Sequence, residues 1–351
     1  MFRFGFAILC FAMLAVSLVV GLLAHRDAGR LFSPNVVFVA PLYDDAALFF
    51  SRGEIERLIA SFPAYEIYAV GTESTVISAQ ATQVRATVYY VPPAFFNIFF
   101  LNITEGGPPR EYTNSLMLSE LLAWRLFGGF NVTGITVWVL NEPFVISGVV
   151  EGDGLGYAAW LPGSFAPTMP LPSIYIRFPY YNIVDAHVVP REMLGFRNHN
   201  EYMILDINRY IEAMGIRNRL VLYVLWVVGL VWAVLNFSRI VLQVKEKLPN
   251  KREFAKLALT GCVALFSVYV LLDGIGGIIY ALPNLSDANA SLSGFIFGWV
   301  DMPPAEFIPP NLARLFELNA RANFAFFSAL AAVFFAIMVN IICKWMPHVN
   351  P

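Results

Sequence analysis

Cysteine, histidine and charged side chains are all scarce in this sequence of 351 residues. It has three cysteines and four histidines, and only 14% of its residues are charged. Cys10, Cys262 and Cys343 lie far apart in apolar runs, so a disulfide framework is excluded. Neither they nor the histidines show metal-site spacing. Because the formal net charge is −2, the sequence gives no reason to expect nucleic acid as a partner.

Sequence motifs of nucleotide-binding and hydrolytic enzymes are also missing. The phosphate-binding pattern Gly-x-x-x-x-Gly-Lys-Ser/Thr does not occur, and no lysine follows a glycine. The patterns His-Glu-x-x-His and Gly-x-Ser-x-Gly are absent as well. His187 and His199 have no paired ligands in the sequence, and residues 197–200 are typical of a loop. We therefore expect a chain that is not an enzyme and that holds no cofactor or metal of its own.

Long hydrophobic runs are abundant, since 58% of the residues are hydrophobic. About 20 apolar residues in a helix cross the hydrocarbon core of a bilayer, and a cleaved signal peptide has a shorter apolar core. Four runs approach or exceed that length, and they cover residues 4–24, 220–237, 257–282 and 324–345. The predicted fold class is an α-helical membrane protein with four transmembrane helices, and an α+β extracytoplasmic domain inserted between helices 1 and 2.

The distribution of charge predicts the orientation of these helices. Segment 239–256, between the second and third runs, has six Lys or Arg residues against two acids, which is typical of a cytoplasmic loop. Segment 31–216 has nine arginines and seventeen acids, as expected of a translocated domain. Arginines also flank the outer side, including Arg217, Arg314 and Arg321, but every lysine falls on the inner side. We expect both termini in the cytoplasm.

The cytoplasmic loop and one intramembrane acid are the candidate functional residues. The loop could contact a soluble partner, or its cations could only fix topology and meet anionic lipid. Asp273 lies in the third predicted span, where a carboxylate is expensive and usually faces protein or water. It could make a polar contact that shifts during function, or lie at the outer interface. The candidate loop residues are Lys245, Lys247, Lys251, Arg252, Glu253 and Lys256.

The outer domain has mixed periodicity, which predicts an α+β layout. The aromatic pairs at 95–96, 99–100 and 180–181 are expected in its core, and 283–321 is predicted to be a second outer loop. Val84, Ala86, Val88 and Tyr90 alternate along one strand and should share a face. The expected strands are 36–39, 65–70 and 83–91, the helices are 53–60 and 114–127, and a hairpin joins 135–140 to 144–150 about residues 141–143.

Several elements in a fixed order resemble the periplasmic core domain of MacB-type ABC transporter permeases. That family runs from a strand into a Pro-x-Phe-Phe helix, then a turn, a strand and a helix ending in Leu-Phe-Gly, and later a hairpin with Pro-Phe before a Val-Gly-Val-Val-like strand. This chain has Val-Pro-Pro-Ala-Phe-Phe at 91–96, Leu-Phe-Gly-Gly at 126–129 and Asn-Glu-Pro-Phe-Val-Ile-Ser-Gly-Val-Val at 141–150. The resemblance extends to one span, a large outer domain and three further spans, and to the Arg-Glu-Phe-Ala stretch at 252–255.

The resemblance implies a bacterial plasma-membrane permease subunit whose outer domain moves when a separate ATPase subunit hydrolyses ATP. ATP would then bind the partner and not this chain. The implied partners are an ABC ATPase, a second permease copy or a homologous permease, membrane lipid, and an extracellular accessory protein or hydrolase. Two alternatives stay open, namely an FtsX-like regulator of a cell-wall hydrolase and a membrane-anchored sensor or adhesion module without an energy source. The expected domains are 1–30, 31–216 and 217–351.

Overall fold

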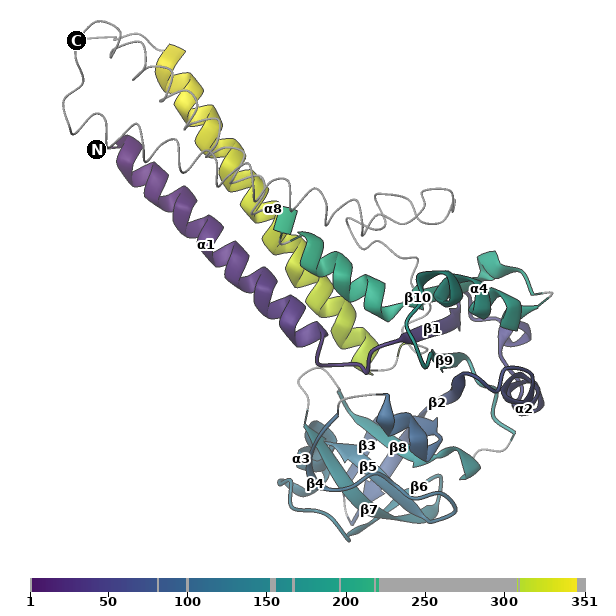
Figure 1. Cartoon of the computed structure of the whole chain (residues 1–351). Helices are drawn as coiled ribbons and strands as arrows, with labels where there is room; N and C mark the ends of the chain where they lie inside the picture. The colour runs from purple at the N-terminus through teal and green to yellow at the C-terminus, as the bar shows by residue number, and fades with distance from the viewer. Residues whose placement is uncertain are drawn as a thin grey trace, which may run out of the picture. The chain divides into compact units, whose positions relative to one another are not determined.

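The chain divides into two compact units in the computed structural model (Figure 1). The structure describes residues 2–80, 82–98, 101–151, 156–165, 168–195, 197–217, 219–220, 308 and 310–345. The helical unit comprises residues 1–25, 212–298 and 319–351, and the mixed unit comprises 26–211 and 299–318.

Two long helices belong mainly to the helical unit. They are α1 (Phe2–Ala28) and α8 (Pro310–Trp345), and Leu14 of α1 packs against Phe326 and Ala329 of α8. In the described part of the chain, one segment, Leu312–Phe335 within α8, is long and apolar enough to cross a membrane, with a mean hydropathy of 1.4.

The predicted spans compare with these helices as follows. The span expected at 324–345 lies inside α8, which begins at Pro310, so residues 310–321 of the predicted outer loop are helical. The charged residues of this stretch concealed the helix in the sequence, and two of them, Arg314 and Glu317, pair with each other one turn apart. Apart from Leu220, the predicted spans 220–237 and 257–282 lie outside the described residues.

The mixed unit is built on a ten-stranded sheet with the order β10-β1-β9-β2-β3-β8-β5-β7-β4, and β6 pairs with both β2 and β7. Its strands are β1 (Val36–Pro41), β2 (Glu66–Ala79), β3 (Thr82–Val91), β4 (Asn102–Gly106), β5 (Ser115–Ser119), β6 (Thr136–Val139), β7 (Glu142–Glu151), β8 (Ala158–Pro162), β9 (Ser173–Arg177) and β10 (Tyr202–Asp206). The long strand β2 links two lobes, because residues 66–70 pair with β9 and residues 71–79 pair with β3.

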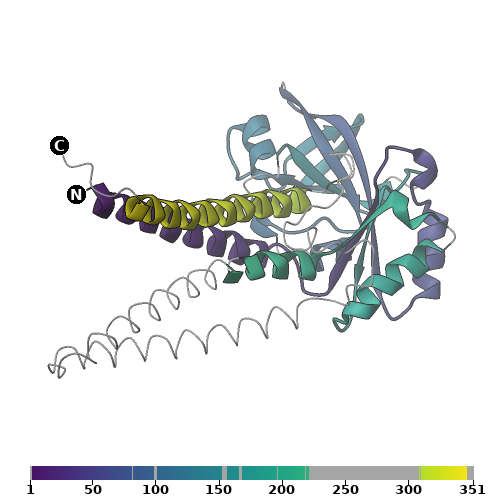
Figure 2. The ribbon, with the colours of Figure 1, turned by 90° about the horizontal axis from the view of Figure 1, so that it is seen from above.

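The helix-backed lobe contains β10, β1, β9 and the first part of β2. Helices α2 (Arg52–Ser61) and α4 (Ile183–Leu194) pack together on one face of this sheet (Figure 2). Side chains from both helices and from the strands form its core, including Ile55, Val189 and Ile176. Helix α2 begins one residue before the predicted start at 53, and Ser51 and Glu54 form a capping box that satisfies the first free backbone N–H groups.

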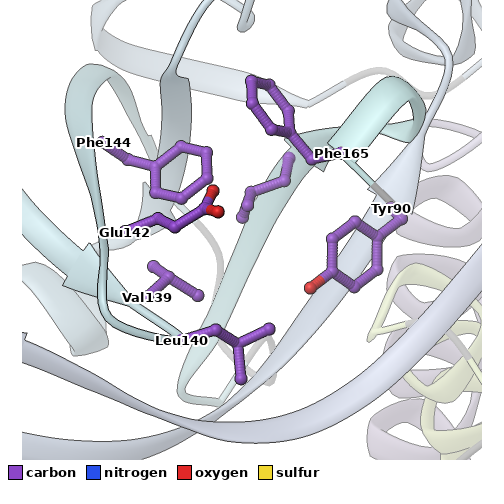
Figure 3. A pocket seen from close by; sticks show the side chains of 7 residues that line it. Tyr90, Val139, Leu140, Glu142, Phe144 and Phe165 are labelled. Atoms are coloured by element: carbon purple, nitrogen blue, oxygen red, sulfur yellow. The ribbon is translucent and has the colours of Figure 1, made fainter. Parts of the chain in front are cut away.

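The barrel lobe is a closed circuit of six strands. The pairings run β2–β3–β8–β5–β7–β6 and back to β2. Strand β4 pairs with the last four residues of β7, 148–151. Its core is almost entirely apolar and contains the four alternating residues of β3, Val84, Ala86, Val88 and Tyr90, so their shared face is confirmed. Helix α3 (Glu120–Phe127) adds Leu122, Ala123 and Leu126 to the same core. A small pocket opens beside the β6–β7 turn (Figure 3).

The helix predicted at 114–127 is half wrong, because its first part is strand β5. Leu116, Met117 and Leu118 are all buried, since β5 lies between β7 and β8 and is covered on both faces. Helix α3 begins only after Ser119, whose hydroxyl accepts the Leu122 N–H. It ends at Gly128, with φ of 72°, as the sequence predicts. The resemblance, which implied a strand and then a helix, was the better guide here.

Two further expectations need correction. The β6–β7 hairpin turns at Leu140 and Asn141, which both have positive φ, because Val139 already pairs with Glu142. Strand β2 runs nine residues beyond the predicted end at 70, in a stretch whose polar side chains concealed the pattern while Ile77 and Ala79 stay buried.

The aromatic pairs expected in the core have different outcomes. Phe95 is buried and its ring contacts Tyr175, with the ring centres 5.6 Å apart. Tyr180 is 85% exposed, so its expected place in the core is wrong. It precedes α4 in a turn, where no strand or helix covers it. Phe99 and Phe100 lie outside the described residues.

Candidate functional site

All the predicted site residues lie outside the described part of the chain. This holds for Asp273 and for the six loop residues Lys245, Lys247, Lys251, Arg252, Glu253 and Lys256. What the structure does describe is how the two segments next to the predicted first and second spans are held, and these segments form the candidate site.

The strands adjoining those spans are neighbours in the sheet. Strand β1 follows α1 after a short connection, and β10 leads directly into helical residues 207–217. The two strands pair antiparallel over five residues, from Val37 opposite Asp206 to Pro41 opposite Tyr202. A displacement of either segment therefore acts on one hydrogen-bonded strand pair.

Asp206 joins strand β10 to the helix that follows it. Its carboxylate accepts the Arg209 N–H at 3.1 Å, as an N-cap does, and accepts the Tyr181 hydroxyl at 2.9 Å. Burial raises the pKa of Asp206, and these two hydrogen bonds oppose that rise. Arg209 in turn contacts Nε2 of His187, so residues of α4 and of the region before it secure the start of the helix.

Within the helical unit, Arg217 is completely buried, although its sequence position predicted a membrane-flanking cation. Its guanidinium donates to the side-chain oxygens of Asn319 and Asn323 on α8 and to the Ala213 carbonyl oxygen. A long cation buried in this way needs such partners, because an unsatisfied one costs several kcal/mol, on the order of 3–5. The two asparagines are four residues apart and so share one face of α8, but nothing in the sequence pairs them with Arg217.

The same helix fits closely against α1. A Cβ atom on Gly215 would lie 2.9 Å from the His25 ring, so the absence of a side chain at this position allows the contact. In the mixed unit, Tyr210 packs edge-to-face on Phe316 of α8, with ring centres 5.8 Å apart. Residues 207–217 thus make specific contacts along their whole length.

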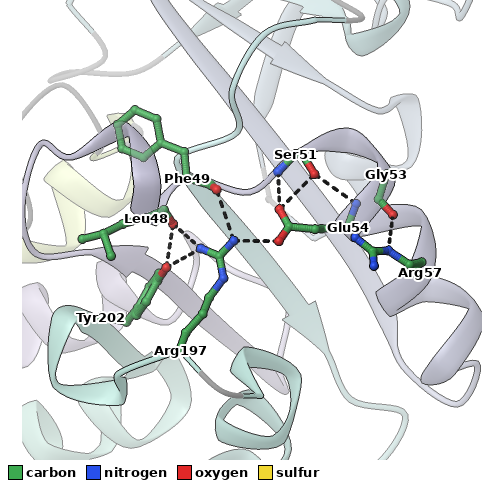
Figure 4. Close-up of polar contacts among 8 residues, drawn as sticks. All are labelled: Leu48, Phe49, Ser51, Gly53, Glu54, Arg57, Arg197 and Tyr202. Carbon is green, nitrogen blue, oxygen red and sulfur yellow. Dashed lines mark hydrogen bonds and ion pairs between the residues drawn. The ribbon is translucent and has the colours of Figure 1, made fainter.

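Arg197, in the segment between α4 and β10, makes polar contacts with the residues before and at the start of α2 (Figure 4). Its guanidinium donates to the Leu48 carbonyl oxygen at 2.7 Å and to the Glu54 carboxylate at 2.8 Å, and it lies 4.9 Å from the centre of the Phe50 ring. Sequence reasoning placed Arg197 in a loop with no role. A lone arginine in a polar segment gives no signal of a partner 143 residues away.

The Arg197 contacts change the acidity of Glu54. Burial alone raises the pKa of Glu54, but hydrogen bonds from the Ser51 backbone and from Arg197 outweigh it and lower the pKa from 4.5 to about 2. Glu54 is therefore an anion at every physiological pH. The ion pair holds the start of α2 against the segment between α4 and β10.

No group of three His, Cys, Asp or Glu side chains that could hold a metal occurs among the residues the structure describes. The described contacts hold chain segments together, including those in which a hydroxyl meets a carboxylate near a helix start, Ser51 with Glu54 and Tyr181 with Asp206. The arrangement fixes the segments that adjoin the predicted first and second spans to one sheet.

Gly107 and Gly148 of the barrel lobe lie close together. A Cβ atom on Gly148 of β7 would lie 2.7 Å from the Gly107 carbonyl oxygen, so β7 and the end of β4 approach too closely for any side chain. Gly106 next to it has φ of 70°, which favours glycine. The motif residues are thus explained by backbone packing.

Comparison with known proteins agrees with this architecture. The family described as MacB-like periplasmic core domain matches residues 5–186, which is more than half of the chain. No curated protein sequence is similar enough to count as a match.

Three solved structures have low similarity to this chain. The extracellular domain of the noncanonic ABC-type transporter YknZ from Gram-positive bacteria has 15% identity and a TM-score of 0.40, over 49% of this chain and 100% of that one. The periplasmic region of MacB from Actinobacillus actinomycetemcomitans has 14% identity and a TM-score of 0.42, over 50% and 91%. A domain of a putative permease from Porphyromonas gingivalis has 16% identity and a TM-score of 0.38, over 49% and 89%.

The family match covers the first predicted span, most of the helix-backed lobe and the whole barrel lobe. The chain belongs to the family of MacB-like periplasmic core domains.

Proposed function

We propose that this chain is the permease subunit of an ABC transporter, and that it couples ATP hydrolysis by a separate ATPase subunit to movement of its extracytoplasmic domain. The observation that carries the proposal is the pairing of β1 with β10. The strands that adjoin the proposed first and second spans are direct neighbours, so a relative shift of those spans acts on the sheet without a long linker between them.

The proposal assigns a membrane topology to the chain. Residues 1–30 form the first span and its flanks, residues 31–216 form the extracytoplasmic domain, and residues 217–351 contribute three more spans, with both termini in the bacterial cytoplasm. The loop 239–256 is then the contact surface for the ATPase, through Lys245, Lys247, Lys251, Arg252, Glu253 and Lys256. Asp273 in the third span is a polar contact that changes during the cycle. ATP binds the partner, and a second permease copy or a homologous permease completes the complex.

Charge reversal in the proposed loop tests the coupling. The double variant Lys251→Glu/Arg252→Glu should lose at least about 90% of the ABC ATPase that copurifies with the tagged wild-type chain from its native host, because opposite charges at a contact surface cost several kcal/mol. Lys344→Glu, a reversal on the same proposed side but outside the loop, is the matched control and should retain the ATPase.

Membrane insertion is measured in the same preparations. Equal amounts of the double variant and the wild type in the membrane fraction would attribute the loss to the contact. If the variant retains the ATPase, the loop assignment is wrong. If the wild-type chain brings down no ATPase at all, the energised permease itself is refuted.

A further inference from the structure

The barrel lobe contains a pocket of about 100 Å³ that none of the contacts described above uses. It lies at the end of the barrel, between the β6–β7 turn and the short 3-10 helix η3 (Gly163–Phe165). A single buried water needs only ~15 Å³ of such space, so the pocket is large enough for a functional group with several heavy atoms. Its lining residues are Tyr90, Val139, Leu140, Glu142, Phe144, Leu161 and Phe165.

Three aromatic rings form much of the wall. Phe144 and Phe165 pack edge-to-face with their ring centres 5.0 Å apart, and Tyr90 lies across the pocket from them (Figure 3). Phe144 and Tyr90 are buried and belong to the barrel core, so their positions are fixed by strand packing. Aromatic faces carry partial negative charge and attract cations.

The charge at the pocket is of one sign. Glu142 is the one charged side chain among the seven lining residues. A second carboxylate lies close by, because the Tyr90 hydroxyl donates to Glu73 at 3.2 Å. Burial and these two carboxylates raise the pKa of Tyr90, so its hydroxyl keeps its proton and continues to donate to Glu73. An anionic ligand would be repelled by this arrangement.

A neutral apolar ligand fits the pocket poorly for another reason. It would remove water from the exposed Glu142 carboxylate at the rim and supply no partner for that charge. An ammonium group on a short alkyl chain matches this lining, which combines one carboxylate and three aromatic rings with the apolar side chains of Val139, Leu140 and Leu161.

We propose that this pocket binds alkylammonium groups, carried either by a small organic cation or by a lysine side chain of a polypeptide. The inference rests on the barrel lobe alone and does not depend on an ATPase. If the chain acts as a permease, the pocket gives its extracytoplasmic domain a selective contact for cationic cargo or for a lysine-bearing partner.

Saturation-transfer NMR on the full chain in lipid nanodiscs tests the proposal. The probes are n-butylammonium, butanol and butyrate, which share the alkyl chain and differ in charge. We expect butylammonium to bind with a dissociation constant of about 1 mM, butanol to bind at least about fivefold more weakly, and butyrate to give no signal. Equal binding of all three probes would overturn the proposal. So would the absence of a butylammonium signal at ~10 mM, which is about ten times the expected dissociation constant.

Glu142→Gln is the decisive variant, because it keeps the shape of the rim and removes the charge. It should weaken butylammonium binding about fivefold, as expected for one partly exposed charge contact, and leave butanol binding unchanged. Glu56→Gln removes an exposed acid on α2 in the helix-backed lobe, and it should leave the binding of butylammonium and of butanol unchanged. Glu142 is exposed, so the variant should melt at the wild-type temperature. Unaltered butylammonium binding by Glu142→Gln refutes the site.

A peptide arm identifies the source of the ammonium group. Acetyl-Gly-Lys-Gly-amide is compared with the same peptide containing norleucine. Tighter binding of the lysine peptide than of butylammonium, again lost in Glu142→Gln, assigns the pocket to a polypeptide. Binding of butylammonium with exclusion of the peptide assigns it to small organic cations.

Discussion

The two lobes of the mixed unit share strand β2 but are held together differently. In the barrel lobe, the core residues inside the six-strand circuit are apolar, and α3 covers them with leucine and alanine. In the helix-backed lobe, the apolar core is supplemented by Arg197 with Glu54, and by Asp206 with Tyr181 and Arg209. Burial of apolar surface is non-directional, whereas hydrogen bonds to charged groups fix particular distances and angles.

The distribution of these contacts follows the connections of the chain. The barrel lobe also has charged contacts, since Glu73 accepts the Tyr90 hydroxyl and Glu105 accepts the Val132 N–H, but the contacts of Arg197 and Asp206 lie in the lobe that contains β1 and β10. The barrel is a closed circuit without that connection, and it needs only to keep its shape around its pocket. The polar contacts of Arg197 and Asp206 thus fix the segments on either side of β10, whereas the closed apolar core fixes the barrel strands relative to one another.

The largest expected effect concerns the barrel core. Leu118 on β5 is completely buried, so Leu118→Ala should cost about 3 kcal/mol through lost apolar contact and the cavity left behind. Hydrogen-exchange mass spectrometry of the full chain should detect faster exchange in β3, β5, β7 and β8. Exchange in β1 and β10 should stay at the wild-type rate. Equal acceleration in both lobes would contradict their energetic separation.

The converse change is Arg197→Met in the helix-backed lobe. It removes hydrogen bonds to Leu48 and Glu54 and leaves the Glu54 carboxylate without that cation, which should cost about 2 kcal/mol after allowance for its partial exposure. Exchange should accelerate in α2 and β10 and remain unchanged in the barrel. Arg52→Met, which removes an exposed i, i+4 pair on the same helix, is the control and should change exchange little. Wild-type exchange in Arg197→Met would refute the role of Arg197.

Sequence reasoning performed best where local chemistry decides the structure. The end of α3 before Gly128 and the alternation along β3 are short-range signals, and both are confirmed. It failed for β5, because a strand buried on both faces has a continuous apolar run that cannot be distinguished from a helix by periodicity.

The candidate site was less predictable, because its contacts join distant parts of the chain. Arg197 and Arg217 are recognised only when the fold brings Glu54 to the first and Asn319 to the second. The pairing of β1 with β10 spans more than 160 residues, and no sequence signal specifies it. The proposed coupling loop at 239–256 was inferred from local charge alone and not from contacts between distant residues. Its assignment stays a prediction.

The smallest expected effect is a pH dependence confined to the helix-backed lobe. The folded-state pKa of Glu54 is about 2, below the usual value of 4.5. A lowered carboxyl pKa stabilises the fold fully above pH 4.5, and that contribution is lost as the pH falls from 4.5 toward 2. Because Glu54 is partly exposed, we expect no more than about 1 kcal/mol.

The difference in thermal stability between the wild type and Glu54→Gln isolates this contribution. Asp206, whose raised pKa favours the fold at low pH, is present in both proteins and cancels. The difference should be largest at pH 6 and should shrink by pH 3. Glu56→Gln on the same helix, which breaks an exposed pair with Arg52, should give a smaller difference at pH 6. A difference for Glu54→Gln that grows as the pH falls would mean that the Arg197 contact does not stabilise the Glu54 anion, and the contrast between a charged lobe and an apolar one would lose its energetic basis.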